Sequence, residues 1–270
     1  MQLFKPAEPQ VTPPCTIVQW IRQNAATYPE REALVCGDTR LNWAGLDSRI
    51  SLAANSIIAR GVRRGDNIAI LAGNSAAYIE IFLGALRAGA CVVPLSTMAS
   101  ATALAKMIQD SRCKLLFVSD NLRELLAPVI EQLDCLTASG RIAIDFTLDG
   151  WENYQQILSV GTDRDPMVPI DFNDPFNLIY SSGTTGTPKG ILHSHRMRAI
   201  QMDRVQQNGY ADNARTLLST PLYSNTTIVA LLPTLVGAGC VVVMPKVDAE
   251  AFLALVEHCL LDTSPSPRDS

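Results

Sequence analysis

The sequence predicts an α/β fold in which helices cover largely parallel β-sheets. Segments with apolar residues at helical spacing alternate with short, uninterrupted apolar runs along most of the 270 residues. Uninterrupted runs are typical of strands that are buried on both faces of a sheet. A helix between two such strands is the crossover that joins parallel neighbours. The alternation therefore indicates repeated strand–helix–strand units.

The predicted elements follow from apolar spacing and from residues that start or stop helices. Helices are expected from Ile17 to a stop at Pro29, from Leu46 to a stop at Gly61, over 75–88, 102–109 and 122–133, from 196 onward, and over 226–235. Ser75 is expected to cap its helix, because a serine hydroxyl accepts hydrogen bonds from the free N–H groups of the first turn. The predicted strands cover residues 68–71, 91–93, 114–118, 142–145, 176–180, 190–195, 216–219 and 240–243.

Residues 161–174 are polar and contain Pro166 and Pro169. We interpret this segment as a connection between two sheet subdomains. The expected organisation is an extended, proline-rich lead-in over residues 1–15, a first α/β subdomain over 16–165 and a second over 166–258.

Residues 259–270 read CLLDTSPSPRDS and closely resemble the translation of a transposon-type sequencing-library adapter, which would have Tyr where Asp262 stands. The alternative is an ordinary tail rich in serine and proline. A helical pattern through Phe252, Leu255 and Val256 should not stop there, so we expect an adapter artefact after a truncated reading frame. A truncated sheet is expected to leave a strand edge unpaired near residues 240–244, which favours association of the fragment.

Composition disfavours several functional classes. The net charge is −4 without a basic run, which argues against nucleic acid as a partner. The seven cysteines are scattered and never spaced as Cys-x-x-Cys, which favours a reduced, cytoplasmic protein over a disulfide framework or a zinc site. The uncharged run 228–244 is interrupted by Pro233, Gly237 and Gly239, so it predicts a buried helix, turn and strand rather than a transmembrane segment.

The most informative segment for function is Tyr180–Gly190, which reads YSSGTTGTPKG. Its glycines allow backbone N–H groups to turn toward one point, and its hydroxyls and single lysine add donors and a charge, as a polyphosphate requires. It is not a Walker A loop, because Lys189 follows Pro188 and precedes Gly190 instead of Ser or Thr. On composition alone the alternative is a flexible surface loop.

The string Ser-Gly-Thr-Thr-Gly-x-Pro-Lys-Gly resembles the phosphate-binding signature of the adenylate-forming (AMP-binding) enzymes, which include acyl- and aryl-CoA ligases, luciferase-type enzymes and nonribosomal adenylation domains. Residues 86–96 and, weakly, 41–46 are similar to further core motifs of that family. The order and spacing of the motifs match over residues 16–258. The resemblance implies that the chain is the N-terminal part of the large domain of such an enzyme.

The resemblance also implies a two-step reaction, in which a small-molecule carboxylic acid reacts with ATP to form an acyl-adenylate and coenzyme A then displaces AMP. The residues implied to bind the phosphates are Ser181, Ser182, Gly183, Thr184, Thr185, Gly186 and Lys189, with Lys189 as the catalytic cation. Mg²⁺ is expected to bridge phosphate oxygens, with its protein ligand in a downstream Tyr-Gly-x-Thr-Glu motif that these residues lack.

Tyr223 and Ser224 are expected near the carboxylate substrate, because they stand where the family delivers an aromatic side chain toward it. Many ligases of the coumarate type have His at the position of Ser224, so the preferred acid stays open. A nonribosomal-type adenylation domain would need an aspartate near residue 224 to hold an amino group, and the sequence has none between Asp212 and Asp248. A further alternative is that the 270 residues form a non-catalytic nucleotide- or phosphate-binding fragment, and we expect them to be inactive alone.

His193 and His195 would point to the same face of a predicted strand. A metal site would need a third ligand, and the neighbouring sequence offers no cluster of Asp, Glu or His. We therefore expect a structural role for this pair and no metal site. The resemblance places a histidine commonly at the position of His195.

Overall fold

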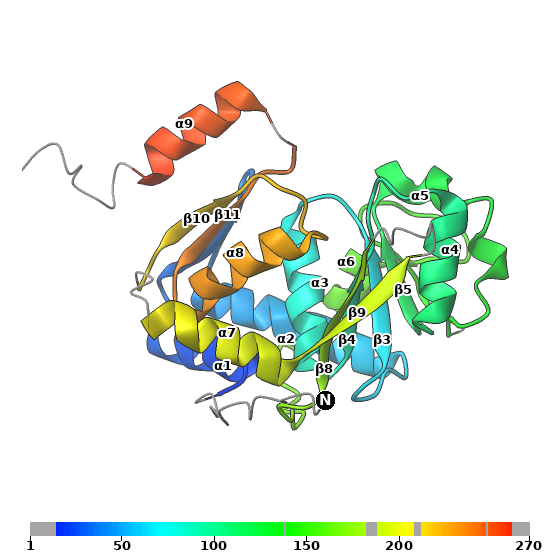
Figure 1. The fold of residues 1–270 in the computed structure, drawn as a ribbon, viewed down its shortest axis with the longest axis horizontal. Helices are drawn as coiled ribbons and strands as arrows, with labels where there is room; N and C mark the ends of the chain where they lie inside the picture. The colour runs from blue at the N-terminus through cyan, green and yellow to red at the C-terminus, as the bar shows by residue number, and fades with distance from the viewer. Residues whose placement is uncertain (1–14, 138, 182–187, 208–211, 247, 261–270) are drawn as a thin grey trace, which may run out of the picture.

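Two β-sheets lie on either side of a layer of helices in the computed structural model (Figure 1). The structure describes residues 15–137, 139–181, 188–207, 212–246 and 248–260, without the side chains of residues 251 and 257–260. The seven-stranded sheet has the order β7-β6-β5-β3-β4-β8-β9, and the four-stranded sheet has the order β10-β11-β1-β2.

Both sheets are largely parallel, which confirms the predicted fold class. In the seven-stranded sheet β9 alone runs antiparallel, to β8, and in the four-stranded sheet β2 alone runs antiparallel, to β1, among the strands of the described residues. The seven strands are β3 (Asn67–Leu71), β4 (Cys91–Pro94), β5 (Leu115–Val118), β6 (Arg141–Ala143), β7 (Glu152–Asn153), β8 (Pro175–Ser181) and β9 (Lys189–Ser194). The four strands are β1 (Glu32–Cys36), β2 (Thr39–Asn42), β10 (Arg215–Leu218) and β11 (Cys240–Val243).

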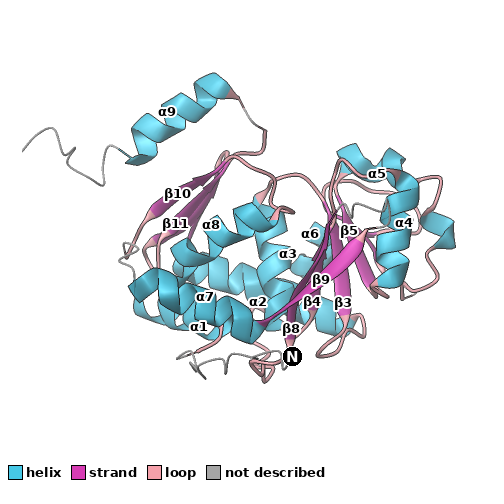
Figure 2. Cartoon of the chain, in the orientation of Figure 1, coloured by secondary structure: helices cyan, strands magenta, loops and turns pink. Residues whose placement is uncertain are grey.

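The helices divide between the layer that both sheets share and the outer faces (Figure 2). The shared layer contains α1 (Ile17–Thr27), α2 (Trp43–Ala59), α3 (Ala76–Arg87) and α8 (Asn225–Val236). The outer face of the seven-stranded sheet is covered by α4 (Ala101–Asp110), α5 (Asp120–Leu126) and the 3₁₀-helix η1 (Ile130–Gln132). The remaining helices are α6 (Tyr154–Ser159), α7 (His195–Gln207) and α9 (Ala249–Leu260).

Strand β3 is buried on both faces, which explains its uninterrupted run of apolar residues. Ile68 and Ile70 belong to the core that the helical layer shares with both sheets. Ala69 and Leu71 belong to the separate core on the other face, under α4 and α5. Because successive side chains of a strand point to opposite faces, a strand with helices on both sides needs apolar residues at every position.

The predicted helix cap at Ser75 is confirmed. The Ser75 hydroxyl accepts a hydrogen bond from the backbone N–H of Tyr78 at 3.1 Å, at the first turn of α3. Thr16 forms a capping box with Gln19 at the start of α1, so that each side chain accepts a hydrogen bond from the backbone N–H of the other residue.

One predicted helix is too long, and one hairpin was not predicted. The helix expected over 122–133 ends at Leu126, because Pro128 has no N–H to continue the backbone ladder. The hairpin of β1 and β2 was not predicted, since its strands are short and β2 is polar, with Thr39 and Arg40 exposed. The turn between them contains Gly37 at φ +56°, a left-handed conformation that favours glycine.

The expected open strand edge at residues 240–244 is also wrong. Strand β11 pairs with β10 on one side and with β1 on the other, so it lies inside the four-stranded sheet. Each sheet thus takes strands from both sides of the connecting segment 161–174. The domain boundary at 165/166 stays a prediction, but the sheets do not follow it. Among the described residues, none of the helices has the length and apolar character that a bilayer crossing requires.

Helices α2 and α3 approach each other closely at Gly84. A Cβ atom at this position would lie 2.5 Å from the Ala53 Cβ and 3.1 Å from the Ala54 backbone nitrogen. We expect Gly84→Ala to lower the free energy of unfolding by about 1–3 kcal/mol, because overpacking outweighs the roughly 1 kcal/mol that alanine gains in helix propensity. Denaturant unfolding of the full-length protein measures this change.

Gly73→Ala is the matched control for this experiment. A Cβ atom at Gly73 meets nothing within 4 Å, so its unfolding midpoint should stay close to that of the wild type. An unfolding midpoint for Gly84→Ala at or above the wild-type value would contradict the close approach of α2 and α3.

Candidate active site

The predicted phosphate-binding loop joins β8 to β9 and is the connection of an antiparallel hairpin. Ser181, the last residue of β8, pairs with Lys189, the first residue of β9. The hairpin therefore holds a serine hydroxyl and a lysine ammonium at the two ends of the loop, and both residues are exposed. The predicted ligands Ser182, Gly183, Thr184, Thr185 and Gly186 lie outside the described residues.

A cleft of about 680 Å³ opens at the start of this loop. It lies beyond the carboxyl ends of β4 and β8, the edge where ligands bind in parallel α/β sheets. Four segments line it: the end of β4 and the following turn, helix α4, the hairpin β8–β9 and the start of α8. The lining residues are Pro94, Ser96, Met98, Ala99, Ala103, Met107, Ile179, Tyr180, Ser181, Pro188, Tyr223, Ser224 and Asn225.

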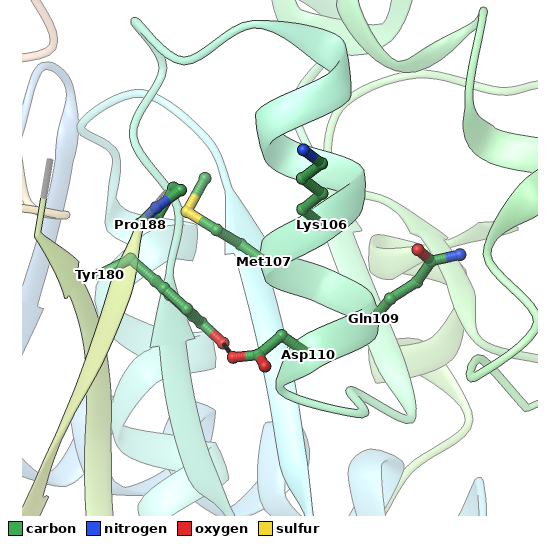
Figure 3. A pocket seen from close by; sticks show the side chains of 6 residues that line it. All are labelled: Lys106, Met107, Gln109, Asp110, Tyr180 and Pro188. Carbon is green, nitrogen blue, oxygen red and sulfur yellow. Dashed lines mark hydrogen bonds between the residues drawn. The ribbon is translucent and has the colours of Figure 1, made fainter. Parts of the chain in front are cut away.

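Tyr180 fixes the end of β8 to helix α4 (Figure 3). Its hydroxyl donates a hydrogen bond to Asp110 Oδ2 at 2.5 Å, across a smaller pocket of about 320 Å³ that also contains Lys106 and Pro188. Burial and this bond to the carboxylate both raise the pKa of Tyr180, so the phenol keeps its proton and donates at neutral pH. The loop therefore begins at an anchored position.

Asn74 fixes the opposite wall of the cleft. Its Nδ2 donates to the carbonyl oxygens of Thr220 and Met244 at 3.0 and 3.1 Å, and its Oδ1 accepts from the backbone N–H of Leu222 at 2.8 Å. These three bonds hold the segment that leads directly into Tyr223 and Ser224.

The structure brings together three of the predicted site residues. Ser181, Tyr223 and Ser224 all line the same cleft, although residues 181 and 223 are 42 positions apart in the chain. Lys189 is not among the lining residues and lies exposed beside the loop. The functional roles assigned to these residues stay predictions.

The prediction that His193 and His195 lie on one strand is wrong. His193 lies in β9, whereas His195 is the first residue of α7 and is fully buried. The His195 ring meets the Phe176 ring edge-on with centroids 5.0 Å apart. Neither imidazole nitrogen of His195 has a hydrogen-bond partner among the described residues.

The site contains a polar network that the sequence analysis missed. Arg198 of α7 donates to the side-chain oxygens of Asn177, Asn225 and Gln201, and 1 % of its surface is exposed. The burial of Arg198 could have been predicted from helical spacing, since residues 195, 198, 199 and 202 form one buried face of α7. Asn177 and Asn225 lie 48 positions apart and carry no such signal.

The described residues fit a phosphate ligand only in part and do not fit a magnesium site. Ser181 and Lys189 supply a donor and a positive charge at the two ends of the loop. Mg²⁺ at a nucleotide usually takes one or two carboxylates besides phosphate oxygens and water, and none of the residues that line the cleft is acidic. Elsewhere in the described part of the chain, no three His, Cys, Asp or Glu side chains come together.

Comparison with known proteins identifies relatives along most of the chain. The family model described as "AMP-binding enzyme" matches residues 21–261. A feruloyl-CoA synthase of Amycolatopsis sp is 30 % identical over 241 residues, covering 88 % of this chain and 46 % of the relative. The long-chain-fatty-acid–CoA ligase FadD13 of Mycobacterium tuberculosis is 26 % identical, covering 87 % and 46 %.

Solved structures support the same fold. The crystal structure of the anthranilate CoA ligase AuaEII in complex with anthranoyl-AMP superposes with a TM-score of 0.84 at 22 % identity, covering 94 % of this chain and 50 % of that one. The chain spans about half the length of the curated relatives it matches.

Burial of His195 predicts a pH-dependent stability. Burial lowers the pKa of His195 to about 4, against the opposing influence of Asp174. As the pH falls from 6.5 toward 4, the unfolded chain takes up a proton that the folded protein excludes, so stability is lost on acidification. Between pH 7.5 and pH 5 this loss should be about 2 kcal/mol.

The variant His195→Leu, which is close to histidine in size and cannot titrate, should lose correspondingly less stability over that interval. Denaturant unfolding of wild type and variant at both pH values measures the difference. His193 has its pKa lowered by burial and by Arg198, so some pH dependence should remain in the variant. Equal losses in the two proteins would show that His195 does not resist protonation.

Proposed function

The chain belongs to the AMP-binding enzyme family, and from this premise we propose that the protein containing it is an ATP-dependent carboxylate–CoA ligase. The observation that carries the proposal is the cleft at the carboxyl ends of β4 and β8. Ser181, at the start of the phosphate-binding signature, lines this cleft together with Tyr223 and Ser224. A nucleotide phosphate at the loop and a carboxylate beside α8 would therefore meet in one space.

The proposed reaction has two steps. A carboxylate oxygen attacks the α-phosphorus of ATP, forming the acyl-adenylate while pyrophosphate leaves. The thiolate sulfur of coenzyme A then attacks the acyl carbon, forming the thioester while AMP leaves. Catalysis of the first step depends mainly on holding two anions together and stabilising the charge on the departing pyrophosphate.

The residues of this chain serve that first step in the proposal. The backbone and hydroxyls of residues 181–186 bind the phosphate oxygens, and Lys189 follows the charge that develops on pyrophosphate. Tyr223 and Ser224 form the wall beside the carboxylic acid. Asn74 and Tyr180 are positioning residues, since their hydrogen bonds hold the two walls of the cleft.

The substrate is proposed to be a carboxylic acid without an amino group, because no aspartate lies between Asp212 and Asp248 to bind one. The named relatives act on different acids, a ferulate and long-chain fatty acids, and Ser224 leaves the choice open. A nonribosomal-type adenylation enzyme is the alternative. The described cysteines are free thiols, which supports a reducing, cytoplasmic location.

Replacement of Lys189 tests the assigned chemistry. In the full-length enzyme, Lys189→Ala should slow ATP–pyrophosphate exchange by about 100-fold, because a charge that stabilises the transition state is removed. The KM for the carboxylic acid should change much less. Lys106→Ala is the matched control, since Lys106 is an exposed lysine on α4 beside the smaller pocket. An unchanged rate of ATP–pyrophosphate exchange in Lys189→Ala would contradict the role proposed for Lys189.

The second alternative is a non-catalytic phosphate-binding fragment. We propose that the 270 residues alone do not complete adenylation, because they lack the Tyr-Gly-x-Thr-Glu motif and the described residues contain no cluster of metal ligands. The purified 270-residue chain should therefore show no ATP–pyrophosphate exchange with a panel of carboxylic acids, whereas the full-length enzyme should. Measurable exchange by the short chain would reject the fragment hypothesis and place the whole adenylation machinery within it.

A further inference from the structure

Arg198 is a buried cation behind one wall of the cleft. Its hydrogen bonds to the described residues all go to neutral amide oxygens: Asn177 Oδ1 at 3.1 and 3.3 Å, Gln201 Oε1 at 3.2 Å and Asn225 Oδ1 at 2.8 Å. No carboxylate of the described residues forms an ion pair with it. Burial lowers the pKa of Arg198 to about 10, so the guanidinium is still charged at neutral pH. In the part of the chain that the structure describes, this positive charge thus lies behind the cleft wall without a carboxylate partner.

This guanidinium dictates how the Asn225 carboxamide is turned. A guanidinium has donors and no acceptor, so Asn225 must present its oxygen to Arg198. Asn225 is the first residue of α8, is exposed, and lines the cleft beside Ser224. Because its oxygen is bonded to Arg198, its NH₂ group is the part of the carboxamide that remains for a ligand in the cleft, and it has no hydrogen-bond partner among the described residues.

The same guanidinium fixes the other end of the network. Two of its N–H groups, on Nε and Nη2, donate to Asn177 Oδ1 in β8, the strand that carries the phosphate-binding loop. Arg198 therefore bridges the strand under the loop and the helix beside the acid. A side chain bonded to both cannot turn without losing bonds at both ends, which restricts the Asn225 carboxamide to one orientation.

The rest of the cleft wall is largely apolar, with Met98, Ala99, Met107 and Ile179 among its lining residues, and none of the lining residues is acidic. Ser96, Ser181, Tyr223 and Ser224 also line the cleft, but their hydroxyls can rotate and can either donate or accept. The Asn225 NH₂ group can only donate, and its orientation is held by Arg198. An acid with an oxygen in reach satisfies this donor, and an acid without one displaces water and leaves it unpaired.

We propose that Arg198 and Asn225 form a specificity device that selects carboxylic acids bearing a hydrogen-bond acceptor next to the first turn of α8. Asn225 contacts the acceptor, and Arg198 is the positioning residue that presents the Asn225 NH₂ group. This inference rests on the proposed ligase function, which supplies the carboxylic acid. It adds the chemical class of the substrate, an acid with an ether, keto or similar oxygen in addition to its carboxylate.

The test uses matched pairs of carboxylic acids that differ by one ether or keto oxygen, placed at successive positions along alkyl and aryl acids. The full-length enzyme is assayed by ATP–pyrophosphate exchange, and the readout is the ratio of kcat/KM within each pair. The wild type should favour the oxygen-bearing member at one position by at least about fivefold. A loss of folded protein lowers both rates of a pair equally, so the ratio reports positioning and not stability.

Three variants test whether Asn225 and Arg198 cause the preference that the ratio of kcat/KM measures. Asn225→Asp keeps the shape and the bond to Arg198 but replaces the donor by an acceptor, so the ratio should fall to about one or below. Arg198→Met releases the Asn225 carboxamide and should lower the ratio toward one. Thr226→Val changes the next, exposed residue, which does not line the cleft, and should leave the ratio unchanged.

The outcomes separate the two proposals. A preference for oxygen-bearing acids that both Asn225→Asp and Arg198→Met abolish supports the device. Exchange without such a preference, or a preference that survives either variant, overturns the device and leaves the ligase function standing. Absence of exchange with every acid removes the ligase function itself, and the specificity device with it.

Discussion

The amide of Asn74 connects the two sheets at the edge where the site is built. Asn74 follows β3 of the seven-stranded sheet, while the carbonyl groups that it binds, those of Thr220 and Met244, follow β10 and β11 of the four-stranded sheet. This one side chain therefore links the carboxyl ends of the two sheets. Because buried and half-buried polar groups must be satisfied, this position demands a side chain with a donor and an acceptor.

The cleft depends on that connection because its walls come from different sheets. The phosphate-binding hairpin β8–β9 belongs to the seven-stranded sheet, and α8 follows β10 of the four-stranded sheet. Their separation is set by the helical layer between the sheets, where Gly84 of α3 lies against Ala53 of α2 with no space for a Cβ atom. Packing far from the site thus sets the distance between the groups that would hold the two substrates.

The fold was predictable from the sequence because its main signals are local. Apolar runs such as 68–71 and caps such as Ser75 depend on a few neighbouring residues, and the structure confirms them. The hairpin β1–β2 escaped prediction because its strands are short and its sheet partner, β11, lies about 200 residues further along the chain. The helix expected over 122–133 ends at Leu126 because Pro128 stops the backbone ladder, although the apolar spacing continues beyond it.

The candidate site was predictable only where a motif marks it. The signature around Lys189 and the segment at Tyr223 stand out in the sequence, whereas Asp110, Asn74 and Asn177 acquire their roles from contacts between distant segments. Arg198 is intermediate, since helical spacing places it on the buried face of α7 but says nothing of its partners. Tertiary hydrogen bonds of this kind leave no periodic pattern in a sequence.

The surroundings of the cleft favour anionic ligands. Two anionic substrates are proposed to meet there, and none of the residues that line the cleft carries a negative charge. Asp110 lies in the neighbouring pocket, where its carboxylate is engaged by the Tyr180 hydroxyl. Desolvation of Arg198 costs of the order of 3 kcal/mol, as its lowered pKa implies, and no ion pair with a described carboxylate offsets this cost. The proposed role of Arg198 gives this costly charge a function: it orients the Asn225 carboxamide, which lines the cleft, and adds a positive field where an anion would bind.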